Sequence, residues 1–378
     1  MGCLRLKSMV CYGYAVPAAG VSLGRRILQE MPAKNRFVES QVARHLSAQR
    51  TSQSLRDSFG RFHNYLRISL TDRCNLRCKY CMPMNGVTCY SPDQLLSQSE
   101  IFALTSLFSK LGVTKVRLTG GEPTVRTDLM DIVGSLSRIS GLKKLGLTSN
   151  GILLRKMLPK LKERGLTHLN LSLDTLIEPK FQLITGSNGW KHVWKTIEMA
   201  ERLYPVIKIN CVVIRGYNEE ELCDFVELTR NRSLDVRFIE YMPFNGNKWE
   251  YSKMVSYLEM MQTIQRQFGD LMKLENNLND TSKGYQVPGF RGRIGFITSM
   301  SQHFCGSCSR LRLTADGCLK VCLHGNSEVS LRDAVRSGAS EEALIELINK
   351  AILSKQEHHA GMFRLAEQSN RPMVQIGG

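Results

Sequence analysis

The sequence has no long hydrophobic run. No stretch approaches the roughly 18 to 20 uncharged apolar residues that a bilayer-spanning helix needs, so a transmembrane helix is not expected. The N-terminal part lacks the compact apolar run of a secretory signal peptide. Low-complexity tracts are also missing. What remains is a chain of 378 residues with 42% hydrophobic content, enough to bury a sizeable core in two domains or in one barrel with an appendage.

Acidic residues are scarce near the N-terminus. Residues 1–62 contain ten Lys or Arg and only three Asp or Glu, which accounts for +7 of the net charge of +17. An Arg-rich, acid-poor segment with Ser and Ala is typical of an organelle transit peptide, and this reading is favoured over a disordered basic tail. We therefore expect residues 1–62 to be a basic leader and the protein to reside in the mitochondrial matrix. The remaining +10 fits a nucleic acid, an anionic small molecule or simple solubility, and composition does not choose among them.

The twelve cysteines are clustered and do not have the scattered pattern of a disulfide framework. Clustered cysteines in a reducing compartment indicate metal binding.

Short β-rich runs alternate with segments of helical period from Leu66 onward. Helical signals include Ser97, which precedes Glu100 by three residues, and Gly112 at the other end of the same segment. The alternation predicts parallel βαβ units. The six expected strands are 66–70, 116–120, 145–150, 169–174, 207–214 and 235–242.

The predicted fold is thus an α/β protein with a partial (βα)6 TIM-type barrel, whose chemistry lies at the carboxyl ends of the strands. After Met242 the alternation stops. We expect the barrel over residues 63–245 and a C-terminal domain over 246–378, with a polar loop at 271–290, short strands around the Asp316-Gly317 turn and a helix at 340–354.

The first cysteine group is Cys74, Cys78 and Cys81, a CxxxCxxC spacing directly after the first expected strand. Three thiolates in one loop can hold a [4Fe-4S] cluster and leave one iron open for another ligand. Zinc with Cys89 as a fourth ligand, or unrelated thiols, are the alternatives. The position at the end of strand one, and Tyr80 just before the last cysteine, favour the cluster.

The second expected strand ends in Thr119-Gly120-Gly121-Glu122-Pro123. Glycines let the backbone approach a ligand closely, and Glu122 supplies an acceptor for an ammonium group. Alone this is a weak signal.

The second cysteine group is Cys305, Cys308 and Cys322. A zinc ribbon would take Cys318 or His303 as its fourth ligand. In an extended strand, however, Cys318 and Cys322 would lie about 13 Å apart, too far for one metal without a turn. A second three-ligand cluster is therefore favoured.

The first loop, followed by the Gly-Gly-Glu-Pro segment, resembles the radical S-adenosylmethionine (SAM) superfamily. Residues 62–378 as a whole resemble one of its families, GTP 3′,8-cyclase, also called the molybdenum cofactor biosynthesis protein A family. The motifs that carry this are TDRCNLRCKYC, VRLTGGEPTVR, TSNG, LNLSLDTL, KINCVV, RFIEYMPF, FCGSCSRLRLTADG and the terminal IGG. The resemblance implies two [4Fe-4S] clusters, SAM, and conversion of GTP to 3′,8-cyclo-7,8-dihydro-GTP as the first step of molybdenum cofactor biosynthesis.

The resemblance also implies roles for individual residues. The catalytic cluster would be held by Cys74, Cys78 and Cys81, and the second, which binds the guanine base, by Cys305, Cys308 and Cys322. The SAM contacts would be Tyr80, Gly121, Glu122, Ser172 and Met242. The substrate contacts would be Arg67, Arg117, Thr148, Lys208, Arg310 and Arg312, with Arg237 as a further candidate near the triphosphate. The Gly377-Gly378 tail would thread into the active site, and Cys318 would be a free thiol.

The implied partners are GTP as substrate, an electron donor and the following enzyme, cyclic pyranopterin monophosphate synthase. Neither nucleic acid nor a membrane is expected, and a homodimer is left open. Clustered arginines suit a triphosphate. Two other classes stay open on the residues alone: a zinc or iron–sulfur protein that binds RNA, and a radical SAM enzyme with a second cluster that acts on a peptide.

Overall fold

The computed structural model describes residues 55–83, 85–275 and 279–377. These residues belong to one compact unit, Ser52–Gly378. No helix in the described ranges is long and apolar enough to cross a membrane. The expected leader lies outside the described residues up to position 54, and Gly378 lies outside them too.

Twelve strands form one sheet among the described residues, in the order β12-β11-β10-β1-β2-β3-β4-β5-β6-β9-β8-β7. Strands β1 to β6 are parallel and follow chain order. All six lie within two residues of their expected bounds, so the prediction of a partial barrel is confirmed. The strands are β1 (Tyr65–Ser69), β2 (Lys115–Thr119), β3 (Lys144–Ser149), β4 (His168–Ser172), β5 (Ile207–Val213), β6 (Leu234–Glu240), β7 (Met272–Lys273), β8 (Lys283–Gln286), β9 (Arg293–Ile297), β10 (Arg310–Leu313), β11 (Cys318–Lys320) and β12 (Glu328–Ser330).

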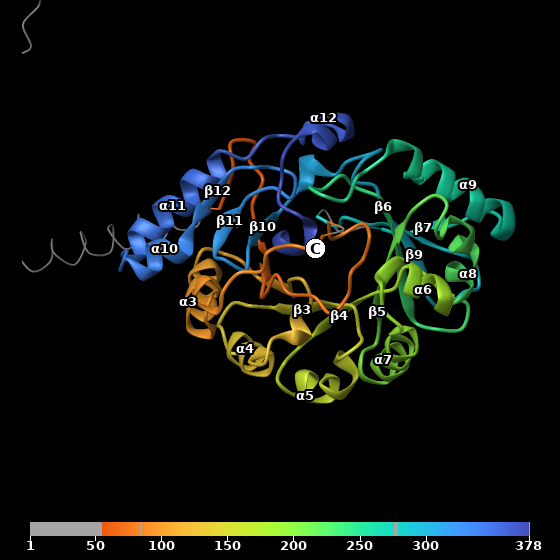
Figure 1. Cartoon of the computed structure of the whole chain (residues 1–378), viewed down its shortest axis with the longest axis horizontal. Helices are drawn as coiled ribbons and strands as arrows, with labels where there is room; N and C mark the ends of the chain where they lie inside the picture. Colours follow the sequence, from red (N-terminus) through yellow and green to blue (C-terminus); the bar gives the residue numbers. More distant parts are fainter. Residues whose placement is uncertain (1–54, 84, 276–278, 378) are drawn as a thin grey trace, which may run out of the picture. The chain divides into compact units, whose positions relative to one another are not determined.

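Helices cover the outer side of the parallel strands (Figure 1). The expected capping box is present, because Ser97 and Glu100 exchange hydrogen bonds at the start of α3. The α-helices are α3 (Gln98–Lys110), α4 (Leu129–Leu136), α5 (Leu158–Glu163), α6 (Glu178–Thr185), α7 (Trp190–Leu203), α8 (Leu222–Glu227), α9 (Tyr257–Phe268), α10 (Leu331–Arg336), α11 (Glu341–Leu353), α12 (Met362–Glu367) and α13 (Met373–Ile376). The 3₁₀ turns are η1 (Pro92–Gln94), η2 (Pro123–Val125), η3 (Leu154–Lys156), η4 (Glu219–Glu221), η5 (Tyr251–Lys253) and η6 (Cys305–Ser307).

The C-terminal third extends the same sheet at both ends. Strand β9 pairs in parallel with β6, and β10 pairs in parallel with β1, so that Arg310 lies beside Tyr65 and Arg312 beside Arg67. The hairpin of β10 and β11 turns at Asp316-Gly317, as the sequence predicts. The loop expected at 271–290 contains strands β7 and β8. Residues 246–378 thus supply strands on both sides of the parallel set, and the boundary near residue 245 stays a prediction.

Residues 55–62, which the sequence analysis placed in the leader, are packed into the fold. Leu55 is fully buried, and Arg56 and Phe62 form an antiparallel bridge. Arg61 forms an ion pair with Asp57, with Nε and Oδ2 2.6 Å apart, and its guanidinium donates to the carbonyl oxygens of Cys305 and Glu357 at 2.8 and 2.7 Å. The folded unit therefore begins ahead of residue 63, and this segment braces the loop of the second cysteine group.

The core lies between the helices and the strands. It is built from the aliphatic and aromatic residues of β1 to β6 together with the inward faces of α3 to α9. Leu66, Ile68 and Leu118 are fully buried there. Because strand side chains alternate, the residues between them, such as Arg67 and Arg117, point to the other face of the sheet, the inside of the barrel. Core packing thus fixes where the polar interior side chains stand.

Candidate active site

The first cysteine loop follows β1 and lines a cavity at the carboxyl ends of the parallel strands. We call this cavity the first cavity. Its wall contains Cys74, Cys78 and Cys81 from the loop. Further residues of the wall lie on or just after β2 to β5, namely Thr119, Gly120, Gly121, Glu122, Thr148, Ser149, Asn150, Ser172, Asp174 and Asn210. The Oγ1 atom of Thr148 and the Oδ1 atom of Asn210 are buried and accept or donate no hydrogen bond within the described residues. These are groups that a polar ligand would satisfy.

Gly120 and Gly121 are required by chain packing. A Cβ atom on Gly121 would lie 2.2 Å from the carbonyl oxygen of Arg73, and one on Gly120 would lie 2.6 Å from that of Thr71. The two glycines therefore allow the end of β2 to touch the cysteine loop. Backbone bonds close the contact, because Gly121 N–H donates to Thr71 O at 2.6 Å and Glu122 N–H to Arg73 O at 2.8 Å.

Glu122 is buried and joins the end of β2 to the end of β3. Its Oε1 atom accepts from Thr124 N, Thr124 Oγ1 and Ser149 Oγ at 3.1, 2.7 and 2.8 Å, and its Oε2 atom accepts from Asn150 N at 2.7 Å. Asn150 in turn donates to Asn75 in the cysteine loop at 2.8 Å. Four hydrogen bonds occupy this carboxylate. These hydrogen bonds help to hold the loop in place, and the predicted contact with an ammonium group stays a prediction.

Tyr80 is tied to the end of β4. Its hydroxyl donates to Asp174 Oδ2 at 2.7 Å, while Val212 N donates to Asp174 Oδ1 at 2.9 Å. Burial raises the pKa of Asp174 to about 6. The aromatic residue of the cluster loop is thereby fixed by a carboxylate two residues beyond Ser172.

The three thiols of the first loop suit a metal cluster. Burial, together with repulsion among the thiolates and from Asp174, raises the pKa of Cys78 and Cys81. Burial likewise raises the pKa of Cys74. Without a cation the thiols stay protonated, and bound iron would supply the positive charge that stabilises three thiolates here. The donor set, three soft sulfur ligands in one loop, fits an iron–sulfur cluster.

A second cavity lies beside the first and is strongly basic. Its described lining contains seven cations and a single acid, Asp280; the cations are Arg67, Lys115, Arg117, Lys208, Arg237, Arg310 and Arg312. The guanidinium of Arg117 donates to Tyr65 Oη at 2.8 Å and to Asn170 Oδ1 at 2.9 Å, which fixes its position in the cavity wall. Arg237 pairs with Asp235 at 2.8 Å. Such a concentration of positive charge is suited to a polyphosphate.

The crowding of cations shifts the pKa values of two residues that line the cavity. Burial alone would raise the pKa of Tyr65, but Arg117, Arg67 and Lys115 outweigh it and lower the pKa to about 7. Burial, followed by repulsion from Arg237, lowers the pKa of Lys208 to about 7. Each shift relieves excess positive charge, and an anionic ligand would do the same.

The second cysteine group, Cys305, Cys308 and Cys322, lines this second cavity. Burial would raise the pKa of Cys308, yet Arg310 and Lys355 lower it to about 6. The buried Lys355 Nζ donates to Cys308 Sγ at 3.4 Å and lies 2.9 Å from His63 Nε2. A thiol held as thiolate next to two further thiols also fits an iron–sulfur cluster. Cys318 does not line this cavity; its Sγ lies 3.7 Å from Asp316 Oδ2.

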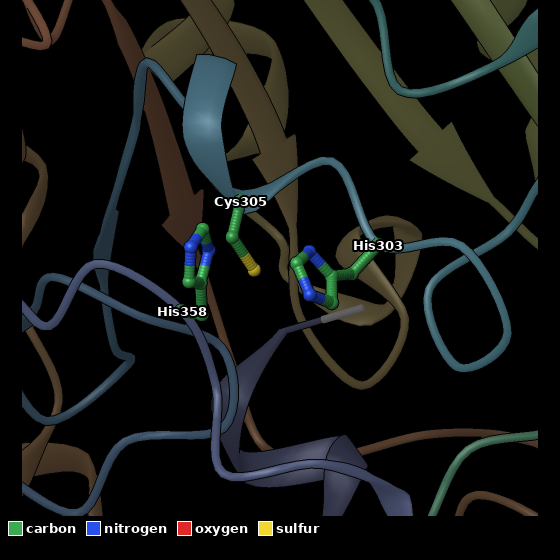
Figure 2. Close-up of side chains that lie close together, drawn as sticks. All are labelled: His303, Cys305 and His358. Atoms are coloured by element: carbon green, nitrogen blue, oxygen red, sulfur yellow. The ribbon is translucent and has the colours of Figure 1, made fainter.

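Two histidines stand next to Cys305. Figure 2 shows the thiol of Cys305 pointing between the rings of His303 and His358. The ligand atoms of these three residues all lie within 4.8 Å of one another, which is a set able to hold a metal ion. His303 also lines the second cavity. Cys305 is therefore shared between a three-cysteine set and a set with two imidazoles.

The two cavities share part of their walls. Asn210, Ile239 and Met373 line both. Met373 belongs to α13, and the described residues at the C-terminus lie within the curve of the sheet (Figure 1). The carbonyl oxygen of Gly377 accepts from Arg312 at 3.0 Å, and a Cβ atom on Gly377 would lie 2.7 Å from Thr119 Oγ1. The tail is thus packed between the ends of β1, β2 and β10.

The structure brings the sequence-predicted residues together in two groups. Tyr80, Gly121, Glu122, Ser172 and the predicted substrate contact Thr148 line the first cavity. Arg67, Arg117, Lys208, Arg237, Arg310, Arg312 and the predicted SAM contact Met242 line the second. The roles themselves stay predictions. The sequence analysis missed Tyr65, Lys115, Asp174 and Lys355. Strand alternation could have found Lys115 and Tyr65, because each lies two residues before a predicted contact; nothing in the local sequence marks Lys355.

Comparisons with known proteins agree with this geometry. Residues 68–229 match the Radical SAM superfamily, and residues 234–361 match the family described as Molybdenum Cofactor Synthesis C. A protein of Alkaliphilus oremlandii named GTP 3′,8-cyclase is 42% identical over 326 residues, which are 86% of this chain and all of that protein. The chain belongs to the GTP 3′,8-cyclase family. Membership in this radical SAM family implies a [4Fe-4S] cluster and SAM binding.

Eukaryotic relatives are more similar still. The Arabidopsis thaliana protein named mitochondrial GTP 3′,8-cyclase is 54% identical over 328 residues, 86% of this chain and 84% of that protein. Molybdenum cofactor biosynthesis protein 1 of Bos taurus is 56% identical over 326 residues, 86% of this chain and 52% of that protein. The chain thus spans about half the length of its animal relatives.

Solved structures show the fold. Streptococcus suis SuiB bound to the precursor peptide SuiA matches 94% of this chain and 82% of its own, at a TM-score of 0.54 and 14% identity. Native anSMEcpe with bound AdoMet matches 79% of this chain and 82% of its own, at a TM-score of 0.53 and 15% identity. Both support the assignment of a radical SAM partial barrel.

Proposed function

We propose that this chain converts GTP to 3′,8-cyclo-7,8-dihydro-GTP in a SAM-dependent radical reaction, the first step of molybdenum cofactor biosynthesis. The observation that carries the proposal is the pair of adjoining cavities, each lined by three cysteines, of which the second also holds seven cations. The names of the relatives support the substrate. A triphosphate matches the charge of the second cavity.

Cys74, Cys78 and Cys81 would hold the first cluster, which with SAM would supply the 5′-deoxyadenosyl radical that takes the 3′ hydrogen of the ribose. The chain positions the reactants. The unpartnered oxygens of Thr148 and Asn210 are available to a ligand of the first cavity, and Asp174 orients Tyr80. In the second cavity the cations hold the triphosphate, and Cys305, Cys308 and Cys322 would hold the second [4Fe-4S] cluster, which would bind the guanine base. The wall that the two cavities share places the ribose close to the radical, and the C-terminal tail excludes water from the site.

The proposal extends to the surroundings of the enzyme. An electron donor would supply the electron that the first cluster needs, and cyclic pyranopterin monophosphate synthase would take the product. The mitochondrial name of the plant relative supports import, and we assign the protein to the matrix. A homodimer is compatible with this scheme. The barrel over residues 63–245 would carry the radical chemistry, and residues 246–378 the second cluster.

The test is an anaerobic assay on protein reconstituted with iron and sulfide, supplied with SAM and GTP. Formation of both 5′-deoxyadenosine and the cyclised nucleotide is expected. Cys78→Ser should abolish both products, whereas Cys308→Ser should keep SAM binding and lose cyclisation. Cys223→Ser is the matched control, because this thiol lines neither cavity. Retention of 5′-deoxyadenosine formation in Cys78→Ser would refute the ligand assignment.

One observation favours another occupant of the second site. The His303, Cys305 and His358 set is typical of a mononuclear zinc ion. Metal analysis separates the two, since a cluster gives iron and sulfide that Cys308→Ser removes, whereas zinc would persist in Cys308→Ser and leave in His303→Ala.

A further inference from the structure

A wide groove lies beside the first cysteine loop and is lined by Cys74, Arg77 and Tyr80 among other residues. This outer groove has a volume of about 1090 Å³, against about 160 and 200 Å³ for the two inner cavities. Cys74 lines both the outer groove and the first cavity. One ligand of the predicted catalytic cluster is therefore accessible from outside the barrel.

The groove is basic, and most of its positive charge is unneutralised. Its described lining contains the cations Arg73, Arg77, Lys79, Lys248 and Lys253 and the acids Asp72 and Glu250. Glu250 pairs with Lys253 at 2.7 Å. Asp72 is fully buried and accepts from Tyr90 N at 2.7 Å. Arg73, Arg77, Lys79 and Lys248 are exposed and form no ion pair within the described part of the chain.

These cations stand on a fixed backbone. Arg77 N and Lys79 N donate to the carbonyl oxygens of Thr185 and Ile184 at 2.8 and 3.1 Å, which fastens the loop to the end of α6. The ammonium of Lys79 lies 5.5 Å from the centre of the Tyr217 ring. Cations on a fixed backbone lose less entropy on binding than cations on a mobile loop would.

Lys248 carries a conformational cost at the rim of the groove. Its φ of 48° is the only left-handed value among the described non-glycine residues. Such a backbone costs on the order of 1–3 kcal/mol and tends to occur at functional positions. The Lys248 side chain is exposed and makes no hydrogen bond, ion pair or ring contact among the described residues, so folding alone does not explain why a lysine stands there.

The groove does not fit the small anions of the proposed reaction. The cations for a triphosphate line the second cavity, and a space this wide would leave most of a small molecule's surface in water. The surface of another protein would fill it. Since the groove borders Cys74, the relevant partner is one that exchanges electrons with the first cluster.

We propose that the outer groove is the docking surface for a protein electron carrier whose redox centre is surrounded by acidic side chains. The inference rests on the proposed function, which needs one electron delivered to the first cluster. The reduced carrier loses that electron and the cluster gains it through the edge at Cys74, with no bond made or broken. Arg73, Lys79 and Lys248 attract the acidic rim and orient the carrier.

The experiment measures bleaching of the first cluster by stopped-flow absorbance, on Cys308→Ser protein so that one cluster contributes. The probe is a reduced plant-type ferredoxin, an acidic one-electron carrier. The test variant is Arg73→Glu/Lys248→Glu. The matched control is Lys156→Glu/Lys195→Glu, which makes the same charge change on exposed lysines of η3 and α7 that line none of the three cavities. Photoreduced deazariboflavin, an uncharged reductant, provides a reference rate for each protein.

Relative to that reference, ferredoxin should reduce the test variant at least tenfold more slowly than the control variant at low salt. Added salt should slow the reduction by ferredoxin of protein with an unsubstituted groove, and should leave the rate for the test variant nearly unchanged. Arg73→Gln/Lys248→Gln should be intermediate. Equal ferredoxin rates in the test and control variants would overturn the docking surface. A cluster that deazariboflavin cannot bleach in any variant would overturn the proposed function itself.

Discussion

The substitution Glu122→Gln separates two roles for the Gly-Gly-Glu-Pro segment. A glutamine keeps the acceptor that serves Thr124 and Ser149, but its amide nitrogen would face the Asn150 N–H, which now donates to Oε2 at 2.7 Å. Two donors would oppose each other in a buried site. One charge-assisted hydrogen bond is lost, at a cost of about 1.5–3 kcal/mol.

If Glu122 mainly holds the cysteine loop in place, the substitution should lower the stability of the fold. The free energy of unfolding, measured by urea titration followed by circular dichroism, should fall by about 1.5–3 kcal/mol. SAM affinity should fall by no more than about tenfold, because the ligand loses only a well-placed loop. Glu227→Gln provides the control. Glu227 is an exposed residue paired with Arg230, and its replacement should change stability by less than about 0.5 kcal/mol.

The opposite pattern would refute this reasoning. If Glu122→Gln were as stable as Glu227→Gln while SAM bound more than about tenfold more weakly, the carboxylate would act on the ligand directly. Equilibrium dialysis under anaerobic conditions gives the affinity, and the same protein samples give the unfolding curves.

Two further predictions concern the second cavity and the tail. With its pKa lowered to about 7, Lys208 is charged below that pH and neutral above it in the free protein, so GTP binding must take up a proton as the pH rises. GTP affinity, measured by calorimetry, should therefore fall by up to about tenfold per pH unit above 7, and Lys208→Met should lose that dependence; an unchanged slope would remove Lys208 from the site. Gly377→Val adds a Cβ that meets Thr119 at 2.7 Å on a backbone with φ of 86°. Strain of about 1–2 kcal/mol and overpacking of about 1–3 kcal/mol should displace the tail and lower turnover about tenfold or more, while SAM and GTP still bind; full turnover would argue against a packed tail.

The sequence predicts the parallel strands well because each has a strong local signal. Hydrophobic runs of β type and the capping box at Ser97 are properties of a few neighbouring residues, and the structure confirms them. The cysteine spacing and the cations on alternate strand positions are equally local. Arg67 and Arg117 had to face away from the core once their neighbours faced it.

Contacts between distant segments have no such signal. The glycines at 120 and 121 were expected to make room for a ligand, yet they first make room for the loop that carries Cys74. Lys355 reaches Cys308 from the end of α11, and residues 55–62 pack against the second cysteine loop from the start of the unit. Each depends on how separate parts of the chain meet in space, which no short pattern records.

The pairing of β10 with β1 has a consequence for how the protein is made. Tyr65 finds its neighbour Arg310 only after most of the chain has left the ribosome, and β6 waits for β9 in the same way. Until then β1 and β6 are unpaired edge strands of the six-stranded sheet, and their free backbone hydrogen-bonding groups can pair with other molecules. Truncation before residue 290 should therefore yield insoluble polypeptide, however complete its first cysteine loop.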